Sequence, residues 1–126
     1  MNKLNTIKQF NKIWVTFNKS GTHKFPDALP GTQYSDVSYL SNTHRHLFKF
    51  KVTIEVFHDD REIEFHQFLN WLESLYTGIL DLNYKSCEMI ANDLYEQINL
   101  KYPNRYINID ISEDGECGCS IDYFTD

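Results

Sequence analysis

The chain has 126 residues, of which 41% are hydrophobic and 15% aromatic, as expected for one globular domain over residues 1–126 rather than a disordered or fibrous protein. Eighteen acidic residues against twelve lysines and arginines give a net charge of −6, which opposes a phosphate backbone and argues against nucleic acid as a partner. The sequence has no apolar run of membrane-spanning length, no signal-peptide pattern and no disulfide framework among its three cysteines, so we expect a cytoplasmic protein without a membrane partner.

The first half of the chain predicts two strands separated by a long irregular segment. Apolar and polar residues alternate over residues 13–18, and this strand is expected to end at Ser20-Gly21. Residues 22–43 hold two of the three prolines and many polar residues, as in loops that fold over a functional site. The clearest strand pattern covers residues 44–56, where His44 and His46 share a face with five apolar residues.

Two amphipathic helices are predicted in the middle of the chain. Apolar residues take a helical spacing from Phe65 to Leu75, and Gly78 follows as a stop signal. Ser86 is a candidate N-cap for a second helix, which ends before Pro103.

Two further strands are predicted near the C-terminus. Isoleucines alternate over residues 107–111, and Asp114-Gly115 predicts a tight hairpin turn into a strand over residues 117–123. The order of elements indicates an α+β fold with an antiparallel four-stranded sheet and two helices on one face. Because such a sheet leaves two unpaired edges, we expect copies of the chain to associate.

Three histidines form a candidate metal site. His44 and His46 leave the same face of one strand, and His23 in the preceding irregular segment could join them. Three imidazoles with an open fourth position are typical of catalytic zinc sites. From the spacing alone, histidines that only form hydrogen bonds or are partly buried are more common than metal ligands.

Five short segments, in this order along the chain, resemble the 6-pyruvoyltetrahydropterin synthase and 6-carboxytetrahydropterin synthase family. They are the stretch from Phe17 through His23 to Pro26, His44-Arg45-His46, Ile63-Glu64-Phe65, Ser86-Cys87-Glu88 and Ile111-Ser112-Glu113. The resemblance extends from Val15 to Tyr123. It implies a T-fold, in which the sheets of several subunits join into a barrel, and therefore a homo-oligomer such as a trimer or a hexamer.

The resemblance also implies a ligand set. It assigns one zinc ion to His23, His44 and His46, and it assigns Glu113 and Glu88 to the ring of a small-molecule ligand, a pterin or a purine-like compound. A carboxylate suits such a ring because its two coplanar oxygens match adjacent ring donors. From the residues alone, Glu113 would be a solvated turn residue and Glu88 an acid favoured by a helix N-terminus.

The sequence departs from the family at the catalytic groups. Leu40 stands where the family has a cysteine, and the segment Leu80-Asp81-Leu82-Asn83 resembles the family's Leu-Asp-His segment without its histidine. Asp81 is therefore the expected catalytic carboxylate. A replacement base could be Asp36, or Cys87 if its position at a helix N-terminus lowers the thiol pKa.

The altered catalytic groups leave enzymatic activity open. One hypothesis is a lyase that acts on a dihydropterin triphosphate with a rebuilt base. The alternative is a module that binds a pterin or nucleotide without chemistry, as a carrier, sensor or sequestering protein. Cys117 and Cys119 are expected to be packing residues of the last strand.

Overall fold

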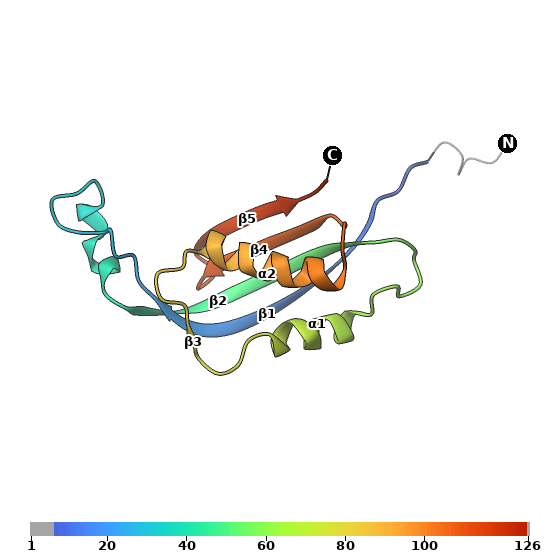
Figure 1. The fold of residues 1–126 in the computed structure, drawn as a ribbon, viewed down its shortest axis with the longest axis horizontal. Helices are drawn as coiled ribbons and strands as arrows, with labels where there is room; N and C mark the ends of the chain where they lie inside the picture. The colour runs from blue at the N-terminus through green and yellow to red at the C-terminus, as the bar shows by residue number, and fades with distance from the viewer. Residues whose placement is uncertain (1–6, 126) are drawn as a thin grey trace.

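A computed structural model of the protein describes residues 7–125 and shows one open sheet with helices packed against it (Figure 1). The strands are β1 (Asn11–His23), β2 (His44–Val56), β3 (Leu80–Asp81), β4 (Ile107–Glu113) and β5 (Cys117–Tyr123). The helices are a 3-10 helix, η2 (Ser35–Ser41), and two α-helices, α1 (Phe65–Ser74) and α2 (Cys87–Lys101). The sheet has five strands in the order β3-β1-β2-β4-β5, and its neighbours are antiparallel except for β3, which runs parallel to β1.

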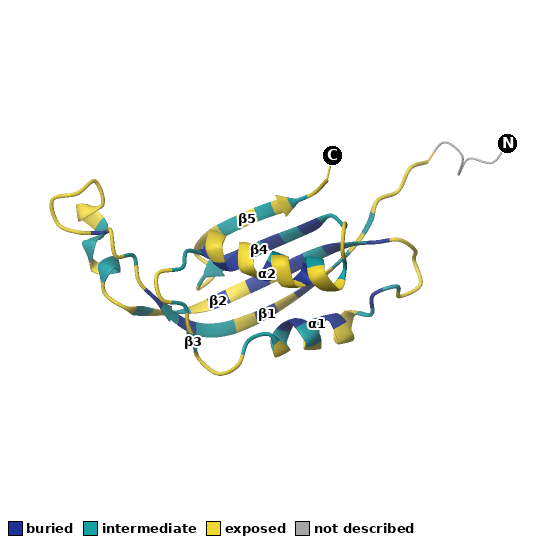
Figure 2. Ribbon diagram, viewed as in Figure 1, coloured by how far each residue is buried: buried dark blue, intermediate teal, exposed yellow. Residues whose placement is uncertain are grey.

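The predicted α+β architecture is confirmed, with both α-helices on one face of the sheet. Alternate residues of the central strands form the apolar layer under the helices, as the dark stripes of Figure 2 show. Its largest fully buried side chains are Phe48, Phe50, Phe68, Ile54, Leu72, Leu94, Ile98, Ile107, Ile109, Ile111 and Val52. Burial of each such side chain stabilises the fold by about 1.5–3 kcal/mol.

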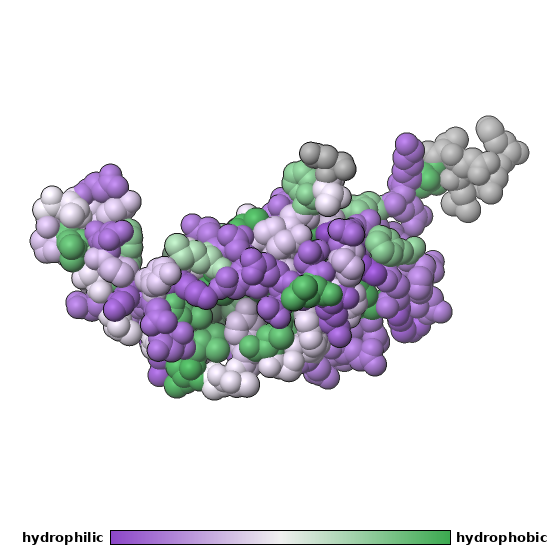
Figure 3. Space-filling view, in the orientation of Figure 1, coloured by the Kyte–Doolittle hydropathy of each residue, from purple (hydrophilic) through white to green (hydrophobic). Residues whose placement is uncertain are grey.

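The outer surface over the helices is mixed in character. In Figure 3 apolar side chains show between the two helices, while most of the remaining surface of this side is polar. Phe65, predicted to begin the apolar spacing of the first helix, is 56% exposed, and Met89 near the start of α2 is 45% exposed. Both lie within the first turns of their helices, where a side chain can extend past the edge of the core. Within residues 7–125, no helix combines the length and apolar character that a membrane crossing needs.

Strand β1 is longer than the sequence predicts. Ser20-Gly21 does not end the strand, because Gly21 pairs with His46 and the ladder continues to His23 opposite His44. A Cβ atom at Gly21 would lie 3.0 Å from the Phe48 ring, so the glycine permits close packing rather than a turn. The predicted four-strand count is corrected as well, since the two-residue β3 adds a fifth strand that is too short to show an alternating pattern.

The predicted helix starts and hairpin turn are confirmed. Ser86 caps α2 by accepting a hydrogen bond from the backbone N–H of Met89, and Glu64 caps α1 in the same way. Asp114 and Gly115 both have positive φ angles, 58° and 75°, as a tight turn between antiparallel strands requires. The irregular segment before β2 differs from the prediction in one respect, because it contains the short helix η2.

An ion pair joins the segment after β2 to the start of β4. The Arg105 guanidinium donates to both carboxylate oxygens of Glu62, at 2.8 and 2.5 Å, and to the backbone carbonyl of Glu55. Glu62 also accepts a hydrogen bond from the backbone N–H of Phe57, whose ring lies under the guanidinium. The hydrogen bonds from Arg105 are the main reason that the pKa of Glu62 lies below its ordinary value.

Replacing Glu62 by glutamine should lower the free energy of unfolding by about 1–3 kcal/mol at neutral pH, because Arg105 loses its charged partner. A depressed folded-state pKa means that the stabilisation is complete above the ordinary carboxyl pKa of 4.5 and is lost as the pH falls through the lowered value. The difference between the wild-type protein and Glu62→Gln should therefore shrink in acid. Urea denaturation at neutral pH and at acid pH measures this difference in the free energy of unfolding.

Glu96→Gln is the matched control, because Glu96 is exposed on α2. This control should unfold at the wild-type urea concentration. Equal midpoints for Glu62→Gln and the wild-type protein at neutral pH would contradict a stabilising role for the ion pair.

Candidate metal centre

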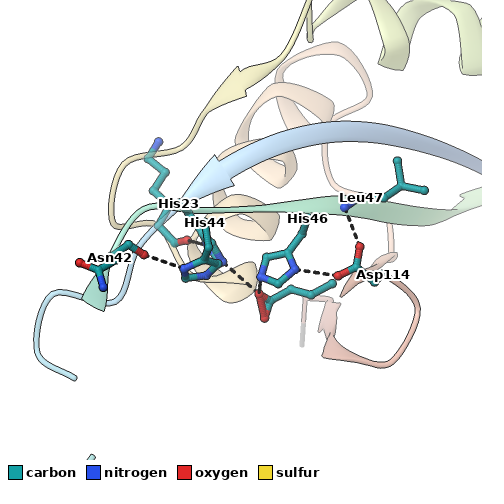
Figure 4. A network of polar contacts seen from close by, with 8 residues as sticks. His23, Asn42, His44, His46, Leu47 and Asp114 are labelled. Atoms are coloured by element: carbon teal, nitrogen blue, oxygen red, sulfur yellow. Dashed lines mark hydrogen bonds and ion pairs between the residues drawn. The ribbon is translucent and has the colours of Figure 1, made fainter. Parts of the chain in front are cut away.

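Three histidines and one glutamate meet where β1 ends and β2 begins, as Figure 4 shows for the imidazoles. Strand register brings them together: His23 is the cross-strand partner of His44, and Glu113 is the partner of Phe48, two residues after His46. One candidate ligand atom from each of the four residues lies within 4.8 Å of all the others. The three histidines predicted from the sequence are therefore neighbours in space, with Glu113 beside them.

Each of the three imidazoles is held by an acceptor at its Nδ1 atom. His23 Nδ1 lies 2.9 Å from the carbonyl oxygen of Lys85, and His44 Nδ1 lies 2.8 Å from that of Asn42. His46 Nδ1 lies 2.7 Å from Asp114 Oδ2. A carbonyl or carboxylate oxygen has no proton to donate, so each Nδ1 must carry the hydrogen. In neutral imidazoles this leaves all three Nε2 atoms with a free lone pair.

Asp114 is a charged anchor for His46. Its Oδ1 atom accepts a hydrogen bond of 2.8 Å from the backbone N–H of Leu47, and its Oδ2 atom accepts from His46. These hydrogen bonds lower the pKa of the Asp114 carboxyl, and the hydrogen bond from Leu47 contributes most. A carboxylate behind a metal-binding imidazole fixes its orientation and makes it a stronger ligand.

Two of the Nε2 atoms face the carboxylate of Glu113. Glu113 Oε2 lies 3.0 Å from His23 Nε2, with hydrogen-bond geometry, and 2.9 Å from His46 Nε2. The contact with His46 lacks hydrogen-bond geometry, and among the described residues this buried Nε2 atom has no hydrogen-bond partner. Lone pairs that face a carboxylate repel it unless a proton or a cation lies between them. Imidazole and carboxylate donors suit a divalent cation such as zinc, so the residues fit the predicted metal.

A cavity of about 350 Å³ opens beside this cluster. His23, His44 and Glu113 line it from the sheet, and Cys87 and Glu88 line it from the start of α2. The two glutamates that were predicted to contact a ring thus border the same space as His23 and His44. A larger hollow of about 430 Å³ lies elsewhere, among residues that include none of these histidines.

Asp36 and Asp81, the predicted catalytic carboxylates, lie outside the cluster. Asp36 is exposed on η2. Asp81 is exposed on β3, where its Oδ1 atom accepts a hydrogen bond from the backbone N–H of Asn83 at 3.3 Å. Neither is among the described residues that line the cavity within one chain.

Cys87 does not have the lowered pKa expected of a replacement base. Burial, assisted by the negative charge of Glu113, raises the pKa of its thiol to about 12. Cys87 as a residue is 6% exposed and belongs to the apolar core, and this desolvation outweighs the field of the helix N-terminus. The alternative interpretation of Cys87 as a packing residue agrees with this burial.

Two residues of the site could not be assigned from the sequence. Cys117 was expected to pack within a strand, but it is exposed, lies opposite Glu113 and lines the cavity. The Asp114-Gly115 turn was the available signal, because it sets which residues of β4 and β5 face each other. The role of Asp114 behind His46 has no sequence signal, since the two residues are 68 positions apart.

Comparison with known proteins shows the fold. The 6-pyruvoyl tetrahydropterin synthase of Caenorhabditis elegans superposes with a TM-score of 0.64 over 94% of this chain and 97% of that chain, at 15% identity. The 6-pyruvoyl tetrahydropterin synthase of Plasmodium vivax gives a TM-score of 0.61 over 94% and 100%, at 13% identity. No protein-family model matches the sequence, and no match is found among curated proteins. The chain therefore has the fold of these synthases, in agreement with the predicted T-fold.

Asp114→Asn should weaken zinc binding about tenfold, because it removes the charge behind His46. Asparagine tolerates the positive φ angle of this turn position as well as aspartate does, so the thermal stability of the metal-free protein should change little. Competition with a chromophoric chelator measures the zinc affinity.

The exposed neighbour Glu116 provides the control for Asp114, and Glu116→Gln should bind zinc like the wild-type protein. An unchanged zinc affinity of Asp114→Asn would argue against a role for Asp114 in supporting the metal.

Proposed function

We propose that this chain binds one zinc ion through His23, His44 and His46 and holds a pterin or purine-like ring beside it, against Glu113 and Glu88. The observation that carries the proposal is the set of three Nδ1 hydrogen bonds, which leave the Nε2 atoms of three neighbouring imidazoles available to a metal, in a cluster whose candidate ligand atoms lie within 4.8 Å of one another. The likeness to two 6-pyruvoyl tetrahydropterin synthases supports the ligand class. When bound, zinc would act as a Lewis acid on an oxygen of the ligand.

The cavity supports a small ring as the ligand. Its volume of about 350 Å³ lies in the lower part of the range for small-molecule sites. Glu88 and Glu113 border it from two different elements, so one planar ring could contact both carboxylates. Carboxylates bind adjacent N–H donors more strongly than neutral acceptors do.

The metal is tested first. The purified protein should contain about one zinc per chain, and His44→Ala combined with His46→Ala should lose it, because a single imidazole cannot hold zinc in water. Elemental analysis after dialysis measures the content. His66→Ala, at an exposed position of α1, is the matched control and should retain zinc. Full zinc occupancy in the double variant would refute the site.

Ring binding is tested with 7,8-dihydroneopterin triphosphate. Glu88→Gln should lower the affinity about tenfold or more, since a hydrogen bond to a charged group contributes about 1.5–3 kcal/mol. The zinc content should stay the same. Isothermal titration calorimetry measures the ligand affinity of the wild-type protein and of Glu88→Gln, with Glu96→Gln on the same helix as the control. Identical affinity in Glu88→Gln and the wild-type protein would remove Glu88 from the binding site.

A lyase is the second candidate function, and the exposed thiol of Cys117 favours it. Cys117 lines the cavity and could act as the base that the family places at the position of Leu40, which lines the same cavity. Asp36 and Asp81 stay predictions for proton transfer. The test is incubation with 7,8-dihydroneopterin triphosphate. A product that the wild-type protein forms and Cys117→Ser does not would identify the lyase. Binding without product would identify a carrier, sensor or sequestering protein.

We also infer a homo-oligomer, a trimer or a hexamer, in which several sheets join into a barrel. Among residues 7–125, strand β5 has no partner on its outer side, and β3 covers only Gly21 and Thr22 of the opposite edge. Long unpaired edges favour association. Trp14, on the sheet face away from the helices, is 60% exposed in the single chain. Light scattering of the purified protein gives the subunit number.

The three free cysteines support a reducing, cytoplasmic location.

A further inference from the structure

We propose that Glu113 is the fourth protein ligand of the metal, so that in the free protein the centre is closed by a carboxylate. The inference rests on the proposed function, which places the metal on the three histidines. It changes the role of Glu113, because a metal ligand is not a free ring acceptor. It also changes the character of the centre, since an open fourth position marks a catalytic site and four protein ligands mark a closed one.

The distances fit a tetrahedral arrangement. In a tetrahedral zinc site with bonds of about 2.0–2.1 Å, neighbouring donor atoms lie about 3.3 Å apart. Glu113 Oε2 lies 2.9 Å and 3.0 Å from two Nε2 atoms, close to that separation. The three imidazole rings are steeply inclined to one another, at 73°, 86° and 79°, with centroids 4.7, 5.2 and 4.9 Å apart. One candidate donor atom from each of these rings and one oxygen of Glu113 lie within 4.8 Å of one another, close enough to share one ion.

The backbone holds Glu113 at this place. Glu113 pairs with Phe48 at the end of the β2–β4 ladder. Its backbone carbonyl oxygen accepts a hydrogen bond of 3.0 Å from the backbone N–H of Glu116. The turn is tied back to β2 as well, because the N–H of Asp114 donates to the carbonyl of Leu47 at 2.8 Å. The Glu113 side chain is therefore directed into the cluster by a fixed strand end.

The carboxylate of Glu113 needs a positive partner, which a protonated imidazole or a metal ion can supply. Its side chain is only 25% exposed, and within residues 7–125 its ion-pair contacts are with the imidazoles of His23 and His46 alone. A partly buried carboxylate without a positive partner is unfavourable. One divalent cation between Oε2 and the three Nε2 atoms would satisfy all four groups.

Cobalt(II) in place of zinc tests this assignment, because its visible spectrum reports the number and kind of ligands. The wild-type protein should give the spectrum of a four-coordinate centre that added acetate does not change. Glu113→Ala should bind cobalt at least about tenfold more weakly. Its spectrum should respond to acetate, which can enter the vacated position. Glu116→Ala, in the adjacent turn, is the control and should behave as the wild-type protein does.

Three outcomes would overturn the fourth-ligand role. Glu113→Ala and Glu113→Gln could both match the wild-type affinity and spectrum, while His44→Ala loses cobalt; the three-histidine site would then stand without Glu113. Acetate could change the wild-type spectrum, which would show an open position without reliance on any variant. Finally, the wild-type protein could take up neither cobalt nor zinc, and the proposed function itself would fail.

Discussion

The register between β1, β2 and β4 is the constraint on which the rest of the structure depends. It sets His23 opposite His44 and Glu113 opposite Phe48. Because side chains alternate across a strand, a slip of one residue would turn His44 and His46 to the other face of the sheet. The same slip would expose Phe48 and the apolar residues that follow it. Burial of the core and assembly of the histidine cluster thus require the same register. Burial of the core supplies most of the free energy that fixes this register.

The hydrogen bonds to the imidazoles tie residues outside the strands to the histidines of the sheet. The acceptors come from Asn42 before β2, from Lys85 before α2 and from Asp114 in the turn after β4. Each fixes a ring in the same tautomer, so the cluster has three inward lone pairs and one inward carboxylate. Without a proton or a cation between them these groups repel one another. A metal ion would therefore stabilise the segment before β2, the start of α2 and the turn after β4 together, because metal binding adds to the folding free energy.

The fold was largely predictable from the sequence because its main elements carry strong local signals. Strand β2 has a long alternation, α2 begins at a capping serine, and the aspartate and glycine of the β4–β5 turn have a well-known preference for such turns. The end of β1 was missed because a glycine usually interrupts a strand, whereas Gly21 makes room for the Phe48 ring. Strand β3 was missed because two residues cannot show a period. Both errors concern tertiary contacts that no local pattern records.

The candidate site was likewise predictable only in part. Histidines spaced by two on a strand indicated a shared face, and the structure brings His23 to them. The contribution of Asp114 and the exposure of Cys117 could not be read from spacing, because each follows from how the β4–β5 turn lies against β2. The pKa of Cys87 was misjudged for a related reason. A helix N-terminus favours a thiolate only where water or a positive charge is near, and Cys87 has core residues and the carboxylate of Glu113 instead.

A centre closed by Glu113, as proposed above, would also constrain the ligand that could open it. A ligand that offered only ring N–H donors would have to draw the carboxylate from the metal and leave the metal one donor short. A ligand that offered only an oxygen to the metal would leave a carboxylate of 25% exposure without a partner. A compound with both groups, at the right separation, replaces each lost contact as it breaks. A pterin with an oxygenated side chain has this combination, and so the closure itself would select for it by leaving buried groups unpaired in any partial match.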